Sequence, residues 1–218
     1  MDTDDLTPVQ ARIVGALLEK QLTTPDVYPL TLKALTAACN QSSNREPVVA
    51  YEERLVETSV LALKAKGLAR IVHPGAGERS TRYRQVLDEA MQLSSAERAL
   101  VCALLLRGAQ TVAELRARTE RLHGFGSADE LEDALDGLAR REPPLVARLD
   151  RRAGQKEQRW LQLLEAGAEE RAALPVSTSL TPSAAVRAAG SDRVDALEAR
   201  VEALEARVAA LAEALGEP

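Results

Sequence analysis

The sequence predicts a mainly α protein with small β wings, in which two tandem winged-helix domains are followed by a linker and a C-terminal coiled-coil helix. One reason is that the order apolar helix, short second helix, longer third helix and strand–turn–strand segment occurs twice. A second is that the two first helices align at an offset of 87 residues, from Thr7 to Ser94, and each opens with a capping box. The third is a heptad repeat at the end of the chain. Together they predict winged-helix domains at residues 1–90 and 91–165, a linker at 166–190 and a coiled-coil tail at 191–218.

In the first copy, the first helix is expected from about Pro8 to Lys20, and prolines then keep the chain extended. A second helix begins near Thr31, and the polar residues 40–47 interrupt the helical pattern. A third helix is expected at residues 49–66, with Gly67 as its stop. Strands at residues 70–72 and 81–86 then flank a turn.

The second copy repeats this order with shorter connections. Capping boxes at Thr111 and Ser127 open its second and third helices. Strands are expected at residues 146–149 and 160–163, around a turn at Gly154. The following residues are rich in Ala, Ser, Thr and Pro without sustained periodicity, which is typical of a linker.

The tail has the most regular apolar pattern in the chain, with spacings that alternate between 3 and 4. Valine at the a positions and leucine at the d positions favour a parallel two-stranded coiled coil. Arg193 and Arg200 at g would face Glu198 and Glu205 at e in a parallel homodimer. The alternative is a single amphipathic helix that packs back on the second domain. The predicted seam consists of Val194, Leu197, Val201, Leu204, Val208, Leu211 and Leu215.

Composition limits the function. Only five residues are aromatic, which argues against a binder of single-stranded nucleic acid, since such proteins stack bases on aromatic rings. Residues 1–90 contain 11 basic and 12 acidic residues, residues 91–165 contain 12 and 12, and residues 166–218 contain 5 and 9. No segment therefore has the positive excess expected of a non-specific DNA binder.

Neither a catalytic centre nor a cofactor or metal site is expected. His73 and His123 are the only histidines, and Cys39 and Cys102 are far apart in apolar helical patterns. No phosphate loop or nucleophile elbow occurs. The acidic N-terminus and the lack of a long apolar run predict a cytoplasmic protein that does not enter a membrane. We expect a non-catalytic binding module.

Two partners are compatible with this pattern. Duplex DNA is the first, because both predicted wings are basic and could contact phosphates; arginines that only keep hairpins soluble are the alternative. The wing residues expected to contact DNA are Arg79, Arg82, Arg84, Arg151, Arg152 and Lys156. In that role the protein would resemble a transcriptional regulator.

A protein partner is the second hypothesis. The third helix of the second copy contains Asp129, Glu130, Glu132, Asp133 and Asp136, a charge unsuited to DNA. An adaptor would use this helix together with the polar loop at residues 40–47. Helix capping explains Asn40 and Ser43 in that loop, whereas Arg45 and Glu46 have no such local explanation.

Seven stretches of the chain are distinctive, at residues 17–21, 23–25, 28–30, 38–41, 44–48, 104–111 and 114–116. They resemble the YceH-like family of bacterial proteins with a domain of unknown function, over residues 6–164. The resemblance implies tandem winged-helix domains, a similar coiled coil and no established activity, and its signature loop includes Asn40, Gln41, Asn44, Arg45 and Glu46. Ser42 stands where relatives often have Lys, which weakens a DNA-contact role for the loop; Ala109 and Val112 replace prolines.

Overall fold

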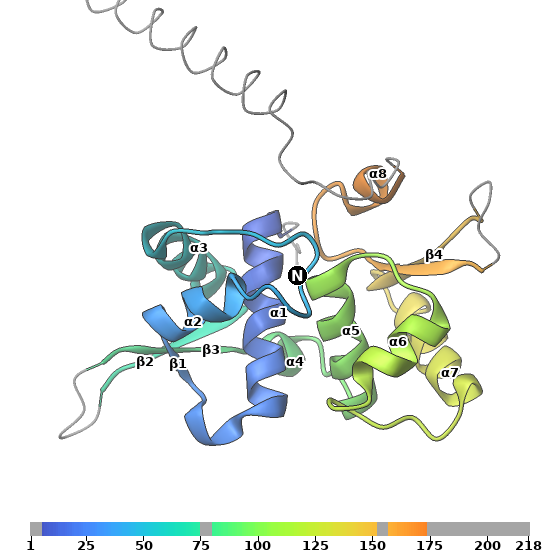
Figure 1. Ribbon diagram of the computed structural model, residues 1–218, viewed down its shortest axis with the longest axis horizontal. Coiled ribbons are helices and arrows are strands. Elements are labelled where there is room, and N and C mark those ends of the chain that lie inside the picture. Colours follow the sequence, from blue (N-terminus) through green and yellow to red (C-terminus); the bar gives the residue numbers. More distant parts are fainter. Residues whose placement is uncertain (1–5, 75–79, 152–156, 174–218) are drawn as a thin grey trace, which may run out of the picture. The chain divides into compact units, whose positions relative to one another are not determined.

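The fold, a computed structural model that describes residues 6–74, 80–151 and 157–173, is mainly helical with small antiparallel sheets (Figure 1). This confirms the fold class expected from the sequence at that level of detail. The described residues all belong to one compact unit, residues 1–174. The predicted coiled-coil seam and most of the predicted linker lie outside the described residues. Within the described ranges, no helix combines the length and the apolar content that a membrane crossing requires.

The first half contains three main helices and a three-stranded sheet. Leu30 of β1 pairs with Tyr83 of β3, and Ala69 of β2 pairs with Gln85 of β3, so the strand order is β1-β3-β2. The elements are α1 (Pro8–Thr23), the 3-10 helix η1 (Pro25–Val27), β1 (Leu30–Thr31), α2 (Leu32–Cys39), α3 (Glu53–Ala65), β2 (Ala69–Val72), β3 (Arg82–Gln85) and α4 (Leu87–Ala90).

The second half follows the same order with a smaller sheet. Strands β4 and β5 pair in antiparallel register, and Gln110 and Trp160 exchange two backbone hydrogen bonds of 2.9 and 2.7 Å in the place that β1 occupies in the first half. The elements are α5 (Ser95–Arg107), α6 (Val112–Thr119), α7 (Ala128–Ala139), β4 (Val146–Leu149), β5 (Arg159–Gln162) and α8 (Ala168–Ala173).

Local chemistry explains where the helices begin. Thr7, Ser94 and Thr111 each accept a hydrogen bond from the backbone three residues later, and the Gln or Glu at that position accepts one in return. These reciprocal bonds satisfy amide groups that have no partner inside a helix. The three capping boxes therefore confirm these predicted starts. At Ser127 only half of the predicted box forms, because the Glu130 carboxylate accepts from the Gly126 backbone instead of the Ser127 backbone.

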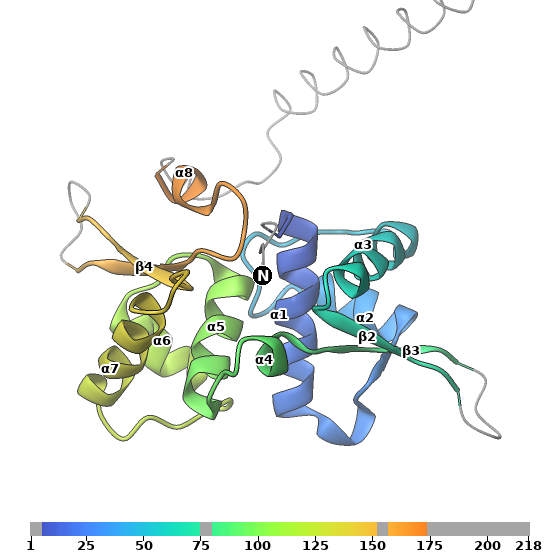
Figure 2. The same ribbon diagram turned by 180° about the vertical axis from the view of Figure 1, so that it is seen from behind.

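Helices α1 and α5 pack against each other at the centre of the unit (Figures 1 and 2). Residues 10–19 of α1 are all buried, as expected for a helix covered on every side. Gly15 permits the close approach, because a Cβ atom there would lie only 2.9 Å from Leu106 Cδ2. The Cys102 thiol is within 3.5 Å of the Gly15 carbonyl oxygen. A single apolar core runs through both halves.

Three boundaries differ from the sequence predictions. Helix α1 extends to Thr23 because the hydroxyls of Thr23 and Thr24 donate to carbonyls one turn earlier. Helix α3 begins at Glu53, four residues later than expected, because the Asn40 side chain forms two hydrogen bonds with the Tyr51 backbone and holds that segment extended. The short helix α8 lies in residues predicted to be linker.

Candidate binding surfaces

The first predicted wing is the β2–β3 hairpin, and its described arginines have partners within the chain. Arg82 donates to the Pro29 carbonyl oxygen at 3.0 Å. Arg84 pairs with Glu89, and Arg70 lies 3.5 Å from the same carboxylate. Arg79 lies outside the described residues. An arginine that already pairs with a carboxylate has less charge to offer a phosphate, so this wing is a weaker anion contact than its sequence predicts.

The second predicted wing, the β4–β5 hairpin, is paired in a similar way at its base. Arg148 lies 3.6 Å from Glu132 and 3.8 Å from Asp136, and its guanidinium lies 4.7 Å from the centre of the Trp160 ring. Arg159 donates to the Ala109 carbonyl oxygen at 3.0 Å. Arg151 is exposed and has no side-chain partner among the described residues. Arg152 and Lys156 lie outside them.

The two hairpins extend toward opposite ends of the unit. Figures 1 and 2, which view it from opposite sides, agree on this arrangement. A straight duplex that touched both hairpins would have to run the length of the unit. The sequence could not show this, because the direction of each hairpin depends on how α1 and α5 pack.

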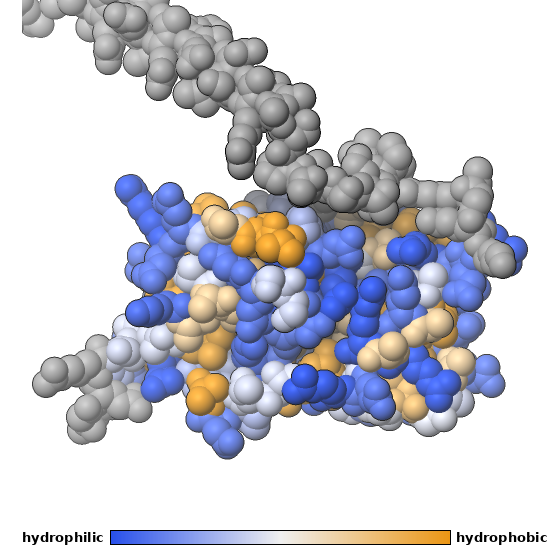
Figure 3. Space-filling view, viewed as in Figure 1, coloured by the Kyte–Doolittle hydropathy of each residue, from blue (hydrophilic) through white to orange (hydrophobic). Residues whose placement is uncertain are grey.

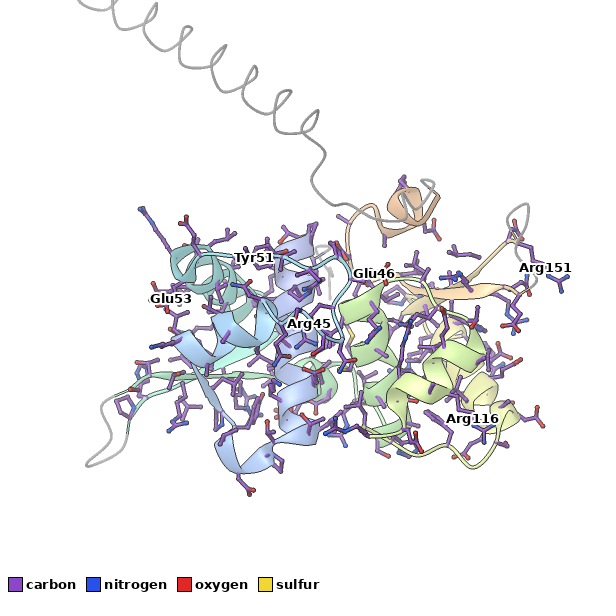
Figure 4. All side chains as sticks on the ribbon, in the orientation of Figure 1. Arg45, Glu46, Tyr51, Glu53, Arg116 and Arg151 are labelled. Carbon is purple, nitrogen blue, oxygen red and sulfur yellow. The ribbon has the colours of Figure 1, made fainter. Side chains whose placement is uncertain are left out.

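The signature loop is centred on a buried ion pair that sequence analysis missed. The Arg45 side chain is fully buried, and its two terminal nitrogens donate to the two Glu19 carboxylate oxygens at 3.0 and 2.6 Å. The same guanidinium donates to the carbonyl oxygens of Ala38 and Asn44 and to the Gln41 side chain. Figure 4 places Arg45 beside α1 at the centre of the unit. Arg45 is therefore a structural residue rather than an exposed recognition residue.

The other loop residues fasten elements together. Asn40 holds the chain that leads into α3, as described above. Asn44 adopts a positive φ of 57° and its amide oxygen accepts from Arg107 of α5. The backbone of Glu46 donates to the Leu106 carbonyl oxygen at 2.9 Å, while its side chain is exposed. The loop thus joins α1, α2 and α5.

A groove of about 810 Å³ lies on the second half, between α6, the start of α7 and the β4–β5 hairpin. Val112, Ala113 and Ala117 contribute apolar surface, and the buried rings of Phe125 and Trp160 form its floor, at 8% and 2% exposure. Arg116 and Arg151, both labelled in Figure 4, line it together with Glu120 and Glu157. The groove therefore combines apolar surface with charges of both signs. Its only sequence signal is the spacing of Arg116 and Glu120, which share one face of α6.

Helix α7 forms one wall of this groove and is strongly acidic. It contains five carboxylates and no basic residue. Glu132 and Asp136 share Arg148, and Glu130 accepts from the Gly126 backbone at 2.7 Å. Asp129 and Asp133 are exposed and have no ion-pair partner among the described residues. The helix therefore keeps a negative outer surface.

The described histidine and cysteine side chains that could act in catalysis are mostly buried or packed against other residues. His123 packs edge-on against Phe125, with ring centres 4.8 Å apart. Burial raises the pKa of the Cys39 thiol to about 12 and raises the pKa of the Cys102 thiol as well, so neither is a ready nucleophile. Among these residues, no group of three or more His, Cys, Asp or Glu side chains is placed to hold a metal ion.

Comparisons with known proteins identify a shared family. Residues 6–155 match the family model described as "Protein of unknown function, DUF480". A UPF0502 protein of Citrifermentans bemidjiense is 43% identical over 200 residues, which is 89% of this chain and 88% of the relative. One from Geobacter sulfurreducens is 45% identical over 197 residues, 88% and 87% of the two chains. One from Chromobacterium violaceum is 47% identical over 164 residues, 75% and 74% of the two chains. The expected resemblance to a family without an assigned function is thereby confirmed, although these relatives are not named YceH-like.

Proposed function

We propose that this chain, which belongs to the DUF480 family, is a non-catalytic binding protein that docks onto a partner protein through its second half. The docking surface consists of the groove between α6, α7 and the β4–β5 hairpin together with the outer face of α7. The partner that fits this surface presents basic side chains next to apolar ones. We further propose that each half is a winged helix, with α3 and α7 as the third helices.

The charge of α7 is the observation that supports this proposal most directly. In a winged helix the third helix normally enters the DNA major groove. Asp129 and Asp133 would there face phosphates, and bringing like charges together is unfavourable. A basic protein surface would be attracted by the same carboxylates, and the attraction would speed association.

The groove gives such a partner a place to bury apolar side chains. Val112, Ala113 and Ala117 offer accessible apolar surface in the groove, and the buried centre of a protein interface is richer in apolar contacts than its rim. Arg116 and Arg151 at its margin can form hydrogen bonds with a partner backbone. Both features favour a protein over a regular duplex, whose surface offers no apolar segment of this size.

A pair of neutralising substitutions tests the docking surface. The variant Asp129→Asn/Asp133→Asn removes two unpaired carboxylates and leaves the Arg148 ion pairs intact. The matched control is Glu53→Gln/Glu57→Gln, which removes two exposed carboxylates, also four residues apart, from the first half of α3. Each tagged protein is expressed in its native host, and co-purified proteins are quantified by mass spectrometry. We expect a basic partner to be retained by the control and reduced at least fivefold by the α7 variant; partner sets that do not differ between the two variants would count against the proposal.

Duplex DNA bound through the wings is the competing proposal and has less support. It rests on the exposed Arg151 and on Arg79, Arg152 and Lys156, which lie outside the described residues. Against it stand the internal partners of Arg82 and Arg84 and the opposite directions of the hairpins. A mobility-shift titration decides it: DNA binding through the wings requires an affinity that falls steeply with salt and is lost with Arg151→Gln/Arg152→Gln/Lys156→Gln.

We also propose that the tail forms a parallel homodimer, on the strength of its heptad pattern alone. Light scattering of the full chain and of a chain ending at residue 190 measures the mass of each. A dimer that becomes a monomer on truncation supports the zipper, and an unchanged mass rejects it.

A further inference from the structure

A second, smaller cavity of about 270 Å³ lies on the seam between the two halves. Its walls are the C-terminal end of α1, the loop at residues 41–44, one face of α5 and the end of α6. Over this seam the surface in Figure 3 is mainly hydrophilic. The cavity is separate from the groove and from both hairpins.

Four basic side chains line this cavity, namely those of Lys20, Arg107, Arg118 and Arg121. Glu19 is the one carboxylate among the lining residues, and both of its oxygens already accept from the buried Arg45. The cavity therefore has an excess of positive charge, although residues 1–90 and 91–165 are each almost neutral overall. Residues from both halves contribute, so neither segment shows the excess by itself.

The four cations are poorly compensated within the described residues. Lys20 has only the occupied Glu19 carboxylate, at 3.7 Å. Arg107 donates to the Asn44 amide oxygen, which is uncharged. Arg118 donates to the Gln110 amide oxygen and lies 3.8 Å from Glu114. Arg121 is exposed and has no side-chain partner in the part of the chain that the structure describes. Burial, followed by the charge of Arg118, lowers the pKa of Arg107, although the Glu46 and Glu19 carboxylates act in the opposite direction.

Neutral hydrogen-bond donors complete the cavity wall. The Gln41 amide oxygen accepts from Arg45, which leaves the amide nitrogen of Gln41 as a donor. Asn44 and Ser43, which carry an amide and a hydroxyl, line the same cavity. Such a set of charged and neutral donors suits an anion with several oxygens, because arginine binds phosphate through two parallel hydrogen bonds.

We propose that this seam cavity binds a small molecule that carries a phosphate group. Its volume is close to the lower limit of about 300 Å³ for ligand pockets, which favours a small metabolite. The phosphate lies between Arg107 and Arg121, and the neutral donors of the loop bind the remaining oxygens. The bound anion links the two halves, because Lys20 belongs to the first and the three arginines to the second.

The test measures binding of inorganic phosphate and of glycerol 3-phosphate to the full chain by calorimetry and by thermal unfolding at constant ionic strength. We expect both to raise the melting temperature more than chloride at the same ionic strength, since a ligand that binds only the folded state stabilises it. The variant Arg107→Gln/Arg121→Gln should bind at least tenfold more weakly. Its unfolding temperature without ligand should not fall, because the change removes like charges from one site.

Two further variants keep the test decisive. Arg54→Gln/Arg140→Gln removes two exposed arginines far from the cavity, and it should bind phosphate as the wild type does. Arg121→Gln alone changes one exposed residue and should weaken binding at least threefold, so the proposal can be judged if the double variant does not fold. No stabilisation beyond that of chloride, or equal binding by cavity and control variants, would overturn the proposal. Binding of short duplex DNA without binding of the small phosphates would overturn it as well.

Discussion

Removing one member of the Glu19–Arg45 pair should destabilise the protein strongly. The Arg45 side chain is fully buried and that of Glu19 is 11% exposed, with two hydrogen bonds of 3.0 and 2.6 Å between them. When one partner of a buried pair is removed, an uncompensated charge remains, at a cost of about 3–5 kcal/mol. We expect that cost for Glu19→Gln, because the guanidinium is left without a counter-ion beside a cavity that already holds four basic groups.

Removing Arg45 instead of Glu19 should lower the free energy of unfolding by a smaller amount. In Arg45→Met, the Glu19 carboxylate keeps Lys20 at 3.7 Å and faces the other cavity cations, so its charge stays partly compensated. The Ala38 carbonyl oxygen loses the donors at 3.0 and 2.8 Å, which leaves a total cost of about 2–3 kcal/mol. The double variant Glu19→Gln/Arg45→Met removes both charges and should cost no more than Glu19→Gln alone. The coupling energy is then at least about 2 kcal/mol.

Urea unfolding followed by circular dichroism gives the free energy of unfolding of each variant, and equal slopes indicate a comparable transition. Glu53→Gln, which neutralises an exposed carboxylate on α3, is the control and should change stability by less than about 0.5 kcal/mol. A cost below about 1 kcal/mol for Glu19→Gln, or additive costs in the double variant, would refute the assignment of Arg45 to a buried structural pair.

Three further predictions concern packing, ionisation and capping. Gly15→Ala should lower the free energy of unfolding by about 1 kcal/mol in a urea titration, because overpacking against Leu106 exceeds the gain in helix propensity. Gly137→Ala is the control and should not lower it, because a Cβ there meets no atom within 4 Å. Burial raises the thiol pKa of Cys39 and of Cys102 in the folded state. Above the unfolded pKa of about 8.5 the thiols therefore ionise only in the unfolded protein, which favours unfolding. The free energy of unfolding should be constant below that pH and should fall by about 1.4 kcal/mol per thiol for each pH unit above it. Unfolding measured from pH 8 to 10 should show this fall, and Cys102→Ala should make it shallower; a flat profile would contradict the burial of the thiols. Ser94→Ala should cost about 1 kcal/mol in the same assay, because it removes the 3.2 Å bond from the Glu97 backbone to the Ser94 hydroxyl and leaves only the 2.8 Å bond from the Ser94 backbone to the Glu97 carboxylate. An unchanged midpoint would show that the hydroxyl cap adds nothing.

Features that depend on neighbouring residues could be predicted from the sequence. The capping boxes involve residues three apart, and the apolar face of α7 follows from the spacing of Leu131, Leu135 and Leu138. Both hairpins form where short apolar segments flank a turn. Such local signals identified the main helices and the principal strands of both sheets, with errors mainly at their ends.

Features that depend on distant residues could not be predicted. Glu19 and Arg45 are 26 positions apart, and nothing local in the polar loop indicates that its arginine is buried. The anion cavity combines Lys20 with arginines about 90–100 positions later in the chain. A net charge summed over a continuous segment does not reveal such a cluster, because its residues come from two segments that are each almost neutral. The same holds for Arg82 in the first wing, whose partner Pro29 is 53 positions away.

The sequence repeat and the directions of the hairpins have a common explanation. Gly15 and Cys102 are 87 positions apart, which is the offset that aligns the two first helices, and the Cys102 thiol lies against the Gly15 carbonyl oxygen. A twofold arrangement of α1 and α5 would bring equivalent residues together in this way. Such an arrangement would also place the two hairpins at opposite ends of the unit, where Figure 1 shows them. The packing of two equivalent helices therefore separates the basic hairpins and brings the basic residues of both halves together at the seam, which is why we assign anion binding to the seam.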